Sequence, residues 1–263
     1  MFSKNRRSVS ACVLLLAAAG GVMSVSAGPL DPPAGPIGST YKTLTEVEPR
    51  IAINAANTPG DADSRFRITQ RGSYYLTANV IGAAGLAGIE IAVGGVTIDL
   101  NGFEMQGAAG SLDAIRMSAA GTTSVVVKNG TIRLWSEDGV DLDTNTPQSV
   151  RVENVHVSSC GQRGIAVGLG IVESCISFNN GGQGLVMGVG QVIDSRATDN
   201  TLSGILLTGS GSSVIGCTAS GNGTHGIAST GAAVLISQCT ASENEGDGIQ
   251  ASIASNVRET PAL

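Results

Sequence analysis

The fold is decided by residues 164–207, which read GIAVGLGIVESCISFNNGGQGLVMGVGQVIDSRATDNTLSGILL. In this stretch and around it, a glycine followed by an aliphatic residue returns at nearly constant spacing. The pair occurs at Gly139-Val140, Gly164-Ile165, Gly184-Leu185, Gly204-Ile205, Gly226-Ile227 and Gly248-Ile249, at intervals of 25, 20, 20, 22 and 22 residues. Such a period is typical of a solenoid, and the short β-rich runs between Gly, Asn and Ser indicate one coil of a parallel β-helix per repeat.

The residue after each glycine-aliphatic pair should point outward, because side chains alternate across a strand. Successive members of this column should stand ~4.8 Å apart. The first-strand column then consists of Glu90, Arg116, Asp141, Ala166, Val186, Leu206, Ala228 and Gln250. The column is charged over three coils and apolar over the next four. Functional residues on this face are therefore sought either at the charged end or along the apolar stripe.

A second strand follows in each coil, and a cysteine fixes its register. The pattern is Val172-x-x-Cys175, Val214-x-x-Cys217 and Ile236-x-x-Cys239, with Asn180, Asn222 and Asn244 five residues after each cysteine and Asn200 in the intervening coil. Asn suits a turn because it tolerates left-handed backbone and can hydrogen-bond along a stack; an Asn-lined binding groove is the alternative. Cys217 and Cys239 lie within disulfide range, but stacked side chains rarely reach the required torsion, which favours buried free thiols.

The first 27 residues have the form of an export signal, with Lys4, Arg6 and Arg7 before an apolar stretch and small residues before a cleavage point after Ala27. This predicts an exported protein of the periplasm, the cell surface or the extracellular space. Residues 28–70 do not repeat and are expected to form an arm and a cap, with a short helix over 43–53. Residues 71–263 are expected to form the β-helix, whose last coil is incomplete, which leaves open whether the chain is naturally short or truncated.

Charge limits the partners. Loss of the signal changes the net charge from −6 to −9, and an acidic protein repels nucleic acid and anionic lipid. Acidic glycans would need a bridging divalent cation, whereas neutral glycans carry no such penalty. The apolar stretch 11–23 is shorter than the ~20 residues that a bilayer requires, so no membrane insertion is expected after signal removal.

The repeat Gly-Ile-x-x-x followed by Val-x-x-Cys-x-x-Ser-x-Asn resembles the right-handed parallel β-helix repeat superfamily, the pectin-lyase-like group of carbohydrate-binding proteins and sugar hydrolases. The stretches 72–77 (GSYYLT) and 95–103 (GVTIDLNGF) look like the opening coils of its exported members. The resemblance covers about residues 65–257. It implies an all-β solenoid of eight to nine coils of 20–26 residues, with any active site on the outer face of the first-strand sheet.

Candidate site residues gather at the charged end of the first-strand column. Glu90, Arg116 and Asp141 are the catalytic candidates, and they are equally a cross-strand ladder of opposite charges. Substrate-binding candidates lie in one short run: Trp135, Glu137, Asp138 and Asp143. Trp135 could pack against a sugar ring, and Asp138, Asp141 and Asp143 could hold Ca²⁺, as could Asp61 and Asp63; no other cofactor is expected.

The catalytic signatures of the superfamily's polygalacturonases, pectate lyases and alginate epimerases are missing from the sequence. Two histidines are too few for a multi-histidine zinc site. The sequence therefore favours a non-enzymatic protein with a binding or structural role toward extracellular or cell-surface glycans. The alternatives are a polysaccharide lyase or glycoside hydrolase, and a truncated or assembly-only solenoid that self-associates through Ala166, Val186, Leu206 and Ala228 or through its C-terminal end.

Overall fold

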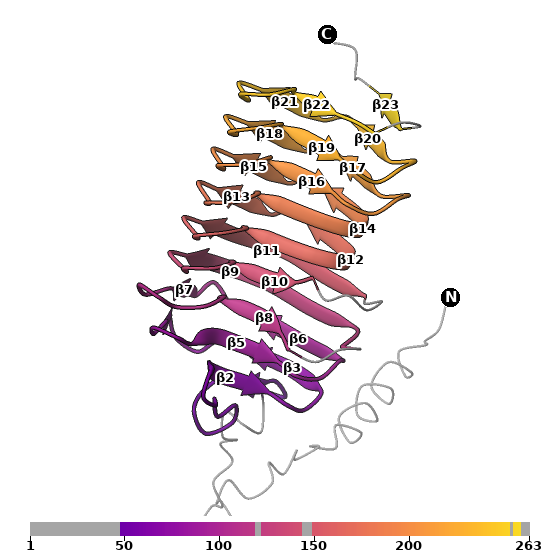
Figure 1. Cartoon of the computed structure of the whole chain (residues 1–263). Coiled ribbons are helices and arrows are strands. Elements are labelled where there is room, and N and C mark those ends of the chain that lie inside the picture. Colours follow the sequence, from indigo (N-terminus) through magenta and orange to yellow (C-terminus); the bar gives the residue numbers. More distant parts are fainter. Residues whose placement is uncertain (1–47, 119–121, 144–148, 253–254, 259–263) are drawn as a thin grey trace, which may run out of the picture. The chain divides into compact units, whose positions relative to one another are not determined.

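In the computed structural model, residues 48–118, 122–143, 149–252 and 255–258 are described, and they form a stack of β-coils (Figure 1). These residues contain no helix, and the ladders between their named strands are parallel. Parallel strands need a long crossover between them, and the remainder of each coil supplies it. None of the described residues belongs to a helix that could cross a membrane.

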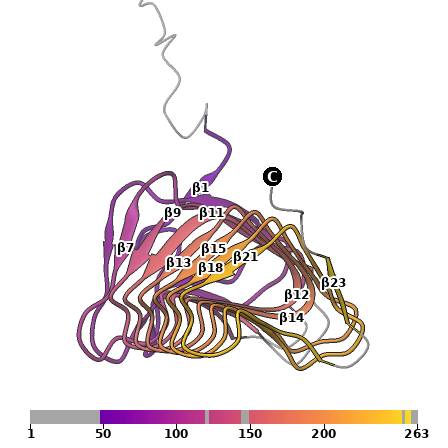
Figure 2. The same cartoon turned by 90° about the horizontal axis from the view of Figure 1, so that it is seen from above.

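The first eight coils contribute strands to three faces, which superimpose when the stack is viewed from one end (Figure 2), and the described residues of the ninth coil contribute to two. The first face contains β2 (Ser64–Ile68), β5 (Ala87–Ile91), β8 (Ile115–Met117), β10 (Val140–Leu142), the first halves of β12 (Ile165–Glu173) and β14 (Leu185–Ile193), β16 (Ile205–Leu207), β19 (Ile227–Ser229) and β22 (Ile249–Gln250). These nine strands correspond to nine coils, so the predicted parallel solenoid of eight to nine coils is confirmed.

The second and third faces complete the coils. The second contains β1 (Ile51–Ala52), β3 (Gly72–Tyr75), β6 (Val96–Asp99), the first halves of β9 (Val125–Arg133) and β11 (Val150–Ser158), the second halves of β12 and β14, β17 (Ser213–Ile215), β20 (Leu235–Ser237) and β23 (Asn256–Arg258). The third contains β4 (Val80–Ile81), β7 (Glu104–Gln106), the second halves of β9 and β11, β13 (Ile176–Phe178), β15 (Arg196–Thr198), β18 (Thr218–Ser220) and β21 (Thr240–Ser242).

The register predicted for the first-strand column is the register of the first face. Glu90 pairs with Arg116, Arg116 with Asp141 and Asp141 with Ala166, and the pairing continues in step to Gln250. Arg67 of β2 precedes Glu90 in the same column. Alternate residues such as Ile89 and Ile91 point inward and are fully buried. The core is therefore a set of stacked aliphatic columns, which accounts for the scarcity of aromatic residues.

The parallel ladder reaches back into the segment that the sequence assigns to the cap. β1 pairs with β3, and β2 pairs with β5. The helix expected over 43–53 is wrong at Ile51–Ala52, which adds a strand to the second face because its backbone groups find partners in β3. Residues 28–47 of the expected arm and cap, like the export signal, lie outside the described residues.

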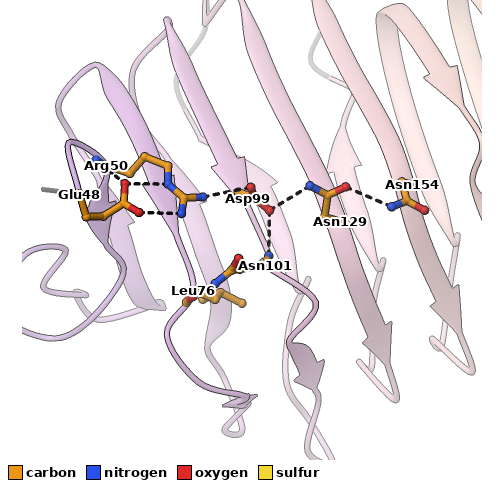
Figure 3. Close-up of polar contacts among 7 residues, drawn as sticks. All are labelled: Glu48, Arg50, Leu76, Asp99, Asn101, Asn129 and Asn154. Atoms are coloured by element: carbon orange, nitrogen blue, oxygen red, sulfur yellow. Dashed lines mark hydrogen bonds and ion pairs between the residues drawn. The ribbon is translucent and has the colours of Figure 1, made fainter. Parts of the chain in front are cut away.

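A polar network on the outer surface ties the start of β1 to later coils (Figure 3). Arg50 donates to Glu48 at 2.8 Å and to Asp99 at 3.1 Å. The amide of Asn129 donates to Asp99 at 3.1 Å, and the amide of Asn154 donates to Asn129 at 3.1 Å. Both asparagines have left-handed backbone, with φ of 60° and 53°. They therefore serve as corner residues whose side chains link one coil to the next.

A second asparagine ladder runs inside the stack, at the corner between the third and first faces. Both the backbone N–H and the side-chain amide of Asn180 donate to Oδ1 of Asn200, at 3.1 and 3.0 Å. The same two bonds join Asn200 to Asn222 and Asn222 to Asn244. Hydrogen bonding along the stack was expected of this column, and it is confirmed. The alternative of an Asn-lined binding groove is wrong for Asn180, Asn200 and Asn222, because these side chains are buried.

The backbone role expected of these asparagines belongs to the residue before each of them. Positive φ values occur at Asn179, Asp199, Gly221 and Glu243, and not at the ladder residues. The ladder begins at Cys160, whose backbone N–H donates to Oδ1 of Asn180 at 3.0 Å. Cys160 therefore stands in the asparagine column, which explains why it does not align with the other cysteines.

Asn200→Ala should lower the free energy of unfolding by about 2–4 kcal/mol, because two buried donors of Asn180 lose their common acceptor. Equilibrium unfolding in urea measures the change. Thr198→Ala in the same coil is the control; its side chain lies on the outer face, so an effect within about 0.5 kcal/mol is expected. Equal losses in the two variants would contradict the role given to the ladder.

Candidate functional site

An ion-pair ladder occupies the N-terminal part of the first face. Glu90 pairs with Arg67 at 3.0 Å on one side and with Arg116 at 2.8 Å on the other. Asp61 pairs with Arg67 at 2.9 Å, and Asp63 pairs with Arg116 at 2.7 Å. The side chain of Glu90 is only 3% exposed, so the two guanidinium groups leave it no open surface toward a ligand. This geometry is that of cross-strand pairs, each contributing roughly 0.2–1 kcal/mol to stability.

Asp141 does not join this ladder, although its backbone pairs with that of Arg116. Its partner is Arg163 of the next coil, at 3.3 Å. The expected acid-base-acid arrangement is therefore wrong at its last pairing. Arg116 already bridges Glu90 and Asp63, and its guanidinium thus lies on the opposite side from Asp141.

Arg163 gathers the acids that the sequence places around Trp135. It pairs with Asp138 at 2.6 Å, and it reaches along the first face to Asp143 at 3.4 Å as well as to Asp141. Asp138 is buried, and Asp143 is exposed. The structure thus brings three of the predicted acids together around Arg163, which is not among the candidate residues of the sequence analysis.

Asp113 belongs to the same group, and sequence reasoning missed it. It lies one coil before Asp138, and its carboxylate accepts the backbone N–H of Asp138 at 2.9 Å. Asp138 accepts the backbone N–H of Arg163 in the same way, at 2.6 Å. The signal was the 25-residue spacing of Asp113, Asp138 and Arg163. Extending the column of Asp138 and Arg163 back by one coil would have found Asp113.

Burial, together with the negative charges of Asp138, Asp141 and Glu137, raises the pKa of Asp113 to about 6, although the hydrogen bond from the Asp138 backbone lowers it. Burial also raises the pKa of Asp141, although Arg163 opposes the shift. A carboxyl group with a pKa near 6 can exchange a proton close to neutral pH. Asp113, which lies just before the first-face strand β8, is therefore the candidate for general acid chemistry.

The sequence allowed a calcium site at Asp138, Asp141 and Asp143, or at Asp61 and Asp63. Among the described residues, the acids whose oxygens lie within 4.8 Å of one another are Asp61, Asp63 and Glu90. These three are already paired with Arg67 and Arg116. In both groups the carboxylates are thus paired with guanidinium groups, and a calcium site at either group stays a prediction.

The sequence suggested that Trp135 could pack against a sugar at the surface. Trp135 is instead 1% exposed, and its indole lies inside the coil. The indole N–H donates to the backbone oxygen of Met105 at 3.1 Å. A Cβ on Gly82 or Gly88 would meet the indole at 2.9 or 2.8 Å, so these glycines make the space that it fills. Trp135 stands in the column of Cys160 and Asn180, and that spacing was the signal for an inward side chain.

The apolar part of the first-strand column is not an exposed stripe. Ala166, Val186 and Ala228 are buried, and Leu206 is half-buried. Small side chains between paired strands on both sides are covered by their neighbours, and this is the physical reason for the correction. Association through this column stays a prediction, which these exposures do not favour.

A trough of about 710 Å³ lies on the outer side of the second face, close to the corner at which the chain passes from the first face to the second. It runs along the stack over β6, β9, β11, β12 and β14, a span of ~19 Å at the strand spacing. We call it the second-face trough. Its lining consists of Gly95, Thr97, Ser124, Val125, Val126, Ser149, Val150, Arg151, Leu169, Gly170, Ile171, Val189 and Gly190.

The trough combines exposed apolar side chains with hydroxyl groups. Leu169 and Val189 are 37% and 42% exposed, which is high for residues of this size. Thr97, Ser124 and Ser149 supply hydroxyls. Arg151 is held in ion pairs with Glu153 and Glu173 of its own and the next coil. The trough therefore offers an apolar surface with polar groups and no unpaired charge among its described lining residues.

The family model of the right-handed β-helix region matches residues 64–212 and 187–258, which is more than half of the chain. The chain belongs to the right-handed β-helix family. No curated protein matches the sequence. The family match confirms the right-handed parallel β-helix that the repeat led us to expect.

Two solved structures are similar to this β-helix. The A-module of a mannuronan C-5 epimerase from Azotobacter vinelandii has a TM-score of 0.50 and 13% identity over 71% of this chain and 67% of the module. The Dettilon tailspike protein has a TM-score of 0.37 and 14% identity over 74% of this chain and 58% of its own length. At these identities the likeness concerns the fold alone.

Asp113→Asn should remove a pH dependence from the stability of this β-helix. The ordinary pKa of 3.8 applies in the unfolded chain and about 6 in the folded chain. The folded protein then binds more protons between these values, so its stability falls as the pH rises through them. Asn keeps the acceptor for the Asp138 backbone. Relative to wild type, the variant should gain roughly 1–3 kcal/mol between about pH 4 and pH 7, measured by urea unfolding. A difference that is constant with pH would contradict the assignment.

Proposed function

We propose that this chain is an exported glycan-binding protein that takes an extended, uncharged polysaccharide into the second-face trough. The observation that carries the proposal is the trough itself. It is open, it runs along the stack, and it spans five coils. A polymer lying along the stack would meet a similar surface in each coil, because equivalent residues repeat at the strand spacing.

The chemistry of the trough suits a sugar chain. Sugar rings present apolar C–H faces and polar hydroxyl edges, and binding sites for such ligands combine apolar surface with a few placed polar groups. Leu169 and Val189 would contact the ring faces, and Thr97, Ser124 and Ser149 would hydrogen-bond the edges. The net charge of −6, or −9 without the signal, favours a neutral polymer over an acidic one.

The double variant Leu169→Glu, Val189→Glu should weaken binding at least about tenfold, which is about 1.4 kcal/mol, because two charges would replace the apolar surface of the trough. Isothermal titration calorimetry against a panel of neutral and acidic polysaccharides, with and without calcium, measures it. The control is Phe178→Glu, an exposed apolar residue on the third face. Equal losses in the control and the trough variant would overturn the assignment to this surface.

The panel also separates the alternatives. Wild-type protein that binds no glycan and self-associates in sedimentation, with association lost in the trough variant, would favour an assembly role over glycan binding. Secretion is tested independently, because an exported protein should begin at Gly28 when its N-terminus is sequenced.

A second candidate is cleavage of a polysaccharide by the acids of the first face, and the raised pKa of Asp113 specifically favours it. Glycoside hydrolysis uses one carboxyl group that is protonated near neutral pH and a second that is ionised. Asp113 fits the first role, and the neighbouring Asp138, which pairs with Arg163 at 2.6 Å, is the second carboxyl group. Asp141 lies three residues after Asp138, in the middle of the first-face strand β10.

If the chain cleaves a polysaccharide, Asp113→Asn should abolish the release of reducing ends, because Asn cannot donate the required proton. Its matched control is Asp99→Asn, which changes an acid of the second face away from this group. Glycan binding without any release of product by the wild type would reject cleavage. Release that survives in Asp113→Asn would reject Asp113 as the acid.

A further inference from the structure

The column of cysteines at the corner between the second and third faces is used by neither proposed function. It contains Cys175, Ser195, Cys217 and Cys239 in successive coils, and the cysteines are free. The ladders on both sides of this corner stay in step, since Val214 pairs with Ile236 and Thr218 with Thr240. Cys239 therefore lies directly one coil above Cys217.

The thiols of this column lean toward the preceding coil. Sγ of Cys239 lies 3.5 Å from the carbonyl oxygen of Val214, which belongs to the coil of Cys217. Sγ of Cys217 lies 3.5 Å from the carbonyl of Val192, and Sγ of Cys175 lies 3.6 Å from that of Val152. Adjacent coils stand ~4.8 Å apart, which is within the α-carbon range of a disulfide, so bond formation requires only that the two side chains turn from the stacked arrangement of the reduced protein to the disulfide torsion. Cys175 is separated from Cys217 by the coil of Ser195, so Cys217 and Cys239 are the adjacent pair.

The two members of the pair differ in access. Cys217 is buried, whereas Cys239 is partly exposed. We propose that Cys217 and Cys239 form a reactive thiol pair, in which Cys239 is the site of attack on small-molecule disulfides and Cys217 completes a disulfide between the last two full coils.

The chemistry balances in two exchanges. The thiolate of Cys239 attacks one sulfur of a disulfide such as glutathione disulfide, forms a mixed disulfide and releases one glutathione thiolate. Cys217 then loses its proton to solvent and attacks Sγ of Cys239, which releases the second glutathione thiolate. The two cysteines are oxidised, and the small disulfide is reduced to two thiols.

Electrostatics support this division of roles. The pKa of Cys239 is lowered, because the thiol of Cys217 donates to it and backbone N–H groups of the coil below stabilise the thiolate. The pKa of Cys217 is raised chiefly by its hydrogen bond with the Cys239 sulfur, a cause that is lost once Cys239 is held in the mixed disulfide, and also by burial. By contrast, burial raises the pKa of Cys175 to about 11 and that of Cys160 to about 12, so these thiols should be inert.

The first test needs no substitution. Folded, reduced protein is incubated with iodoacetamide near neutral pH, and the modification of each cysteine is followed by peptide mass spectrometry. Cys239 should react at least about tenfold faster than Cys175. A Cys239 rate equal to that of Cys175 would overturn the proposal.

The second test maps the product of glutathione disulfide. Wild-type protein should acquire a bond between Cys217 and Cys239, and its unfolding temperature should rise. Cys217→Ser should stop at the glutathione adduct on Cys239, and Cys239→Ser should acquire neither product. Serine is tolerated in this column, as Ser195 shows. Cys175→Ser is the matched control and should behave as the wild type. A bond that involves Cys175 or Cys160, or persistent adducts on the wild type, would overturn the pairing.

Discussion

The in-register pairing of each strand with its equivalent one coil later is the constraint on which the remaining structure depends. It satisfies the backbone groups of all three faces, and it places like residues directly over one another at ~4.8 Å. A residue type whose side chain interacts favourably with the same residue type in the next coil can therefore recur at one position of the repeat. The asparagine ladder does so with two bonds per step from Asn180 to Asn244. The aliphatic columns do so by packing, which fills the core without large aromatic side chains.

The same constraint explains why charged side chains depart from simple columns. Like charges cannot be stacked at this spacing without cost, so arginines are distributed between acids of neighbouring coils. Arg67 and Arg116 enclose Glu90, and Arg163 collects the acids of the coil below. Asp113 forms no ion pair with an arginine of the described residues and is buried, and this burial raises its pKa. In the column of Asp113, Asp138 and Arg163, the first acid thus lies two coils away from the arginine. This leaves Asp113 as a carboxyl group that can exchange a proton near neutral pH.

The sequence was sufficient for the features that depend on spacing alone. The register of the first-strand column, the number of coils and the asparagine ladder follow from the period, because stacking turns a sequence interval into a contact. The sequence was insufficient where a long side chain can reach more than one partner. Arg116 pairs with Asp63 rather than with Asp141, and Asp141 pairs with Arg163. Trp135 shows the opposite failure. Its column position predicts an inward side chain, whereas the acids next to it in sequence favoured a surface position. Gly82 and Gly88, which make room for the indole, belong to coils that precede Trp135 by two repeats.

The two candidate surfaces occupy different sides of the first face. Asp113, Asp138 and Arg163 precede its strands in each coil, whereas the second-face trough begins after them. The strands between, such as Val140–Leu142, are about 10 Å long at the rise of extended chain. A polymer that lies along the stack in the trough therefore does not bring its glycosidic bonds to Asp113. A polymer that reaches Asp113 must lie across the ion pairs of Arg163 and exchange contacts with them, which costs desolvation of buried charge. The trough requires no such exchange, because its exposed Leu169 and Val189 are already open to a ligand, and this difference places binding ahead of cleavage for the protein.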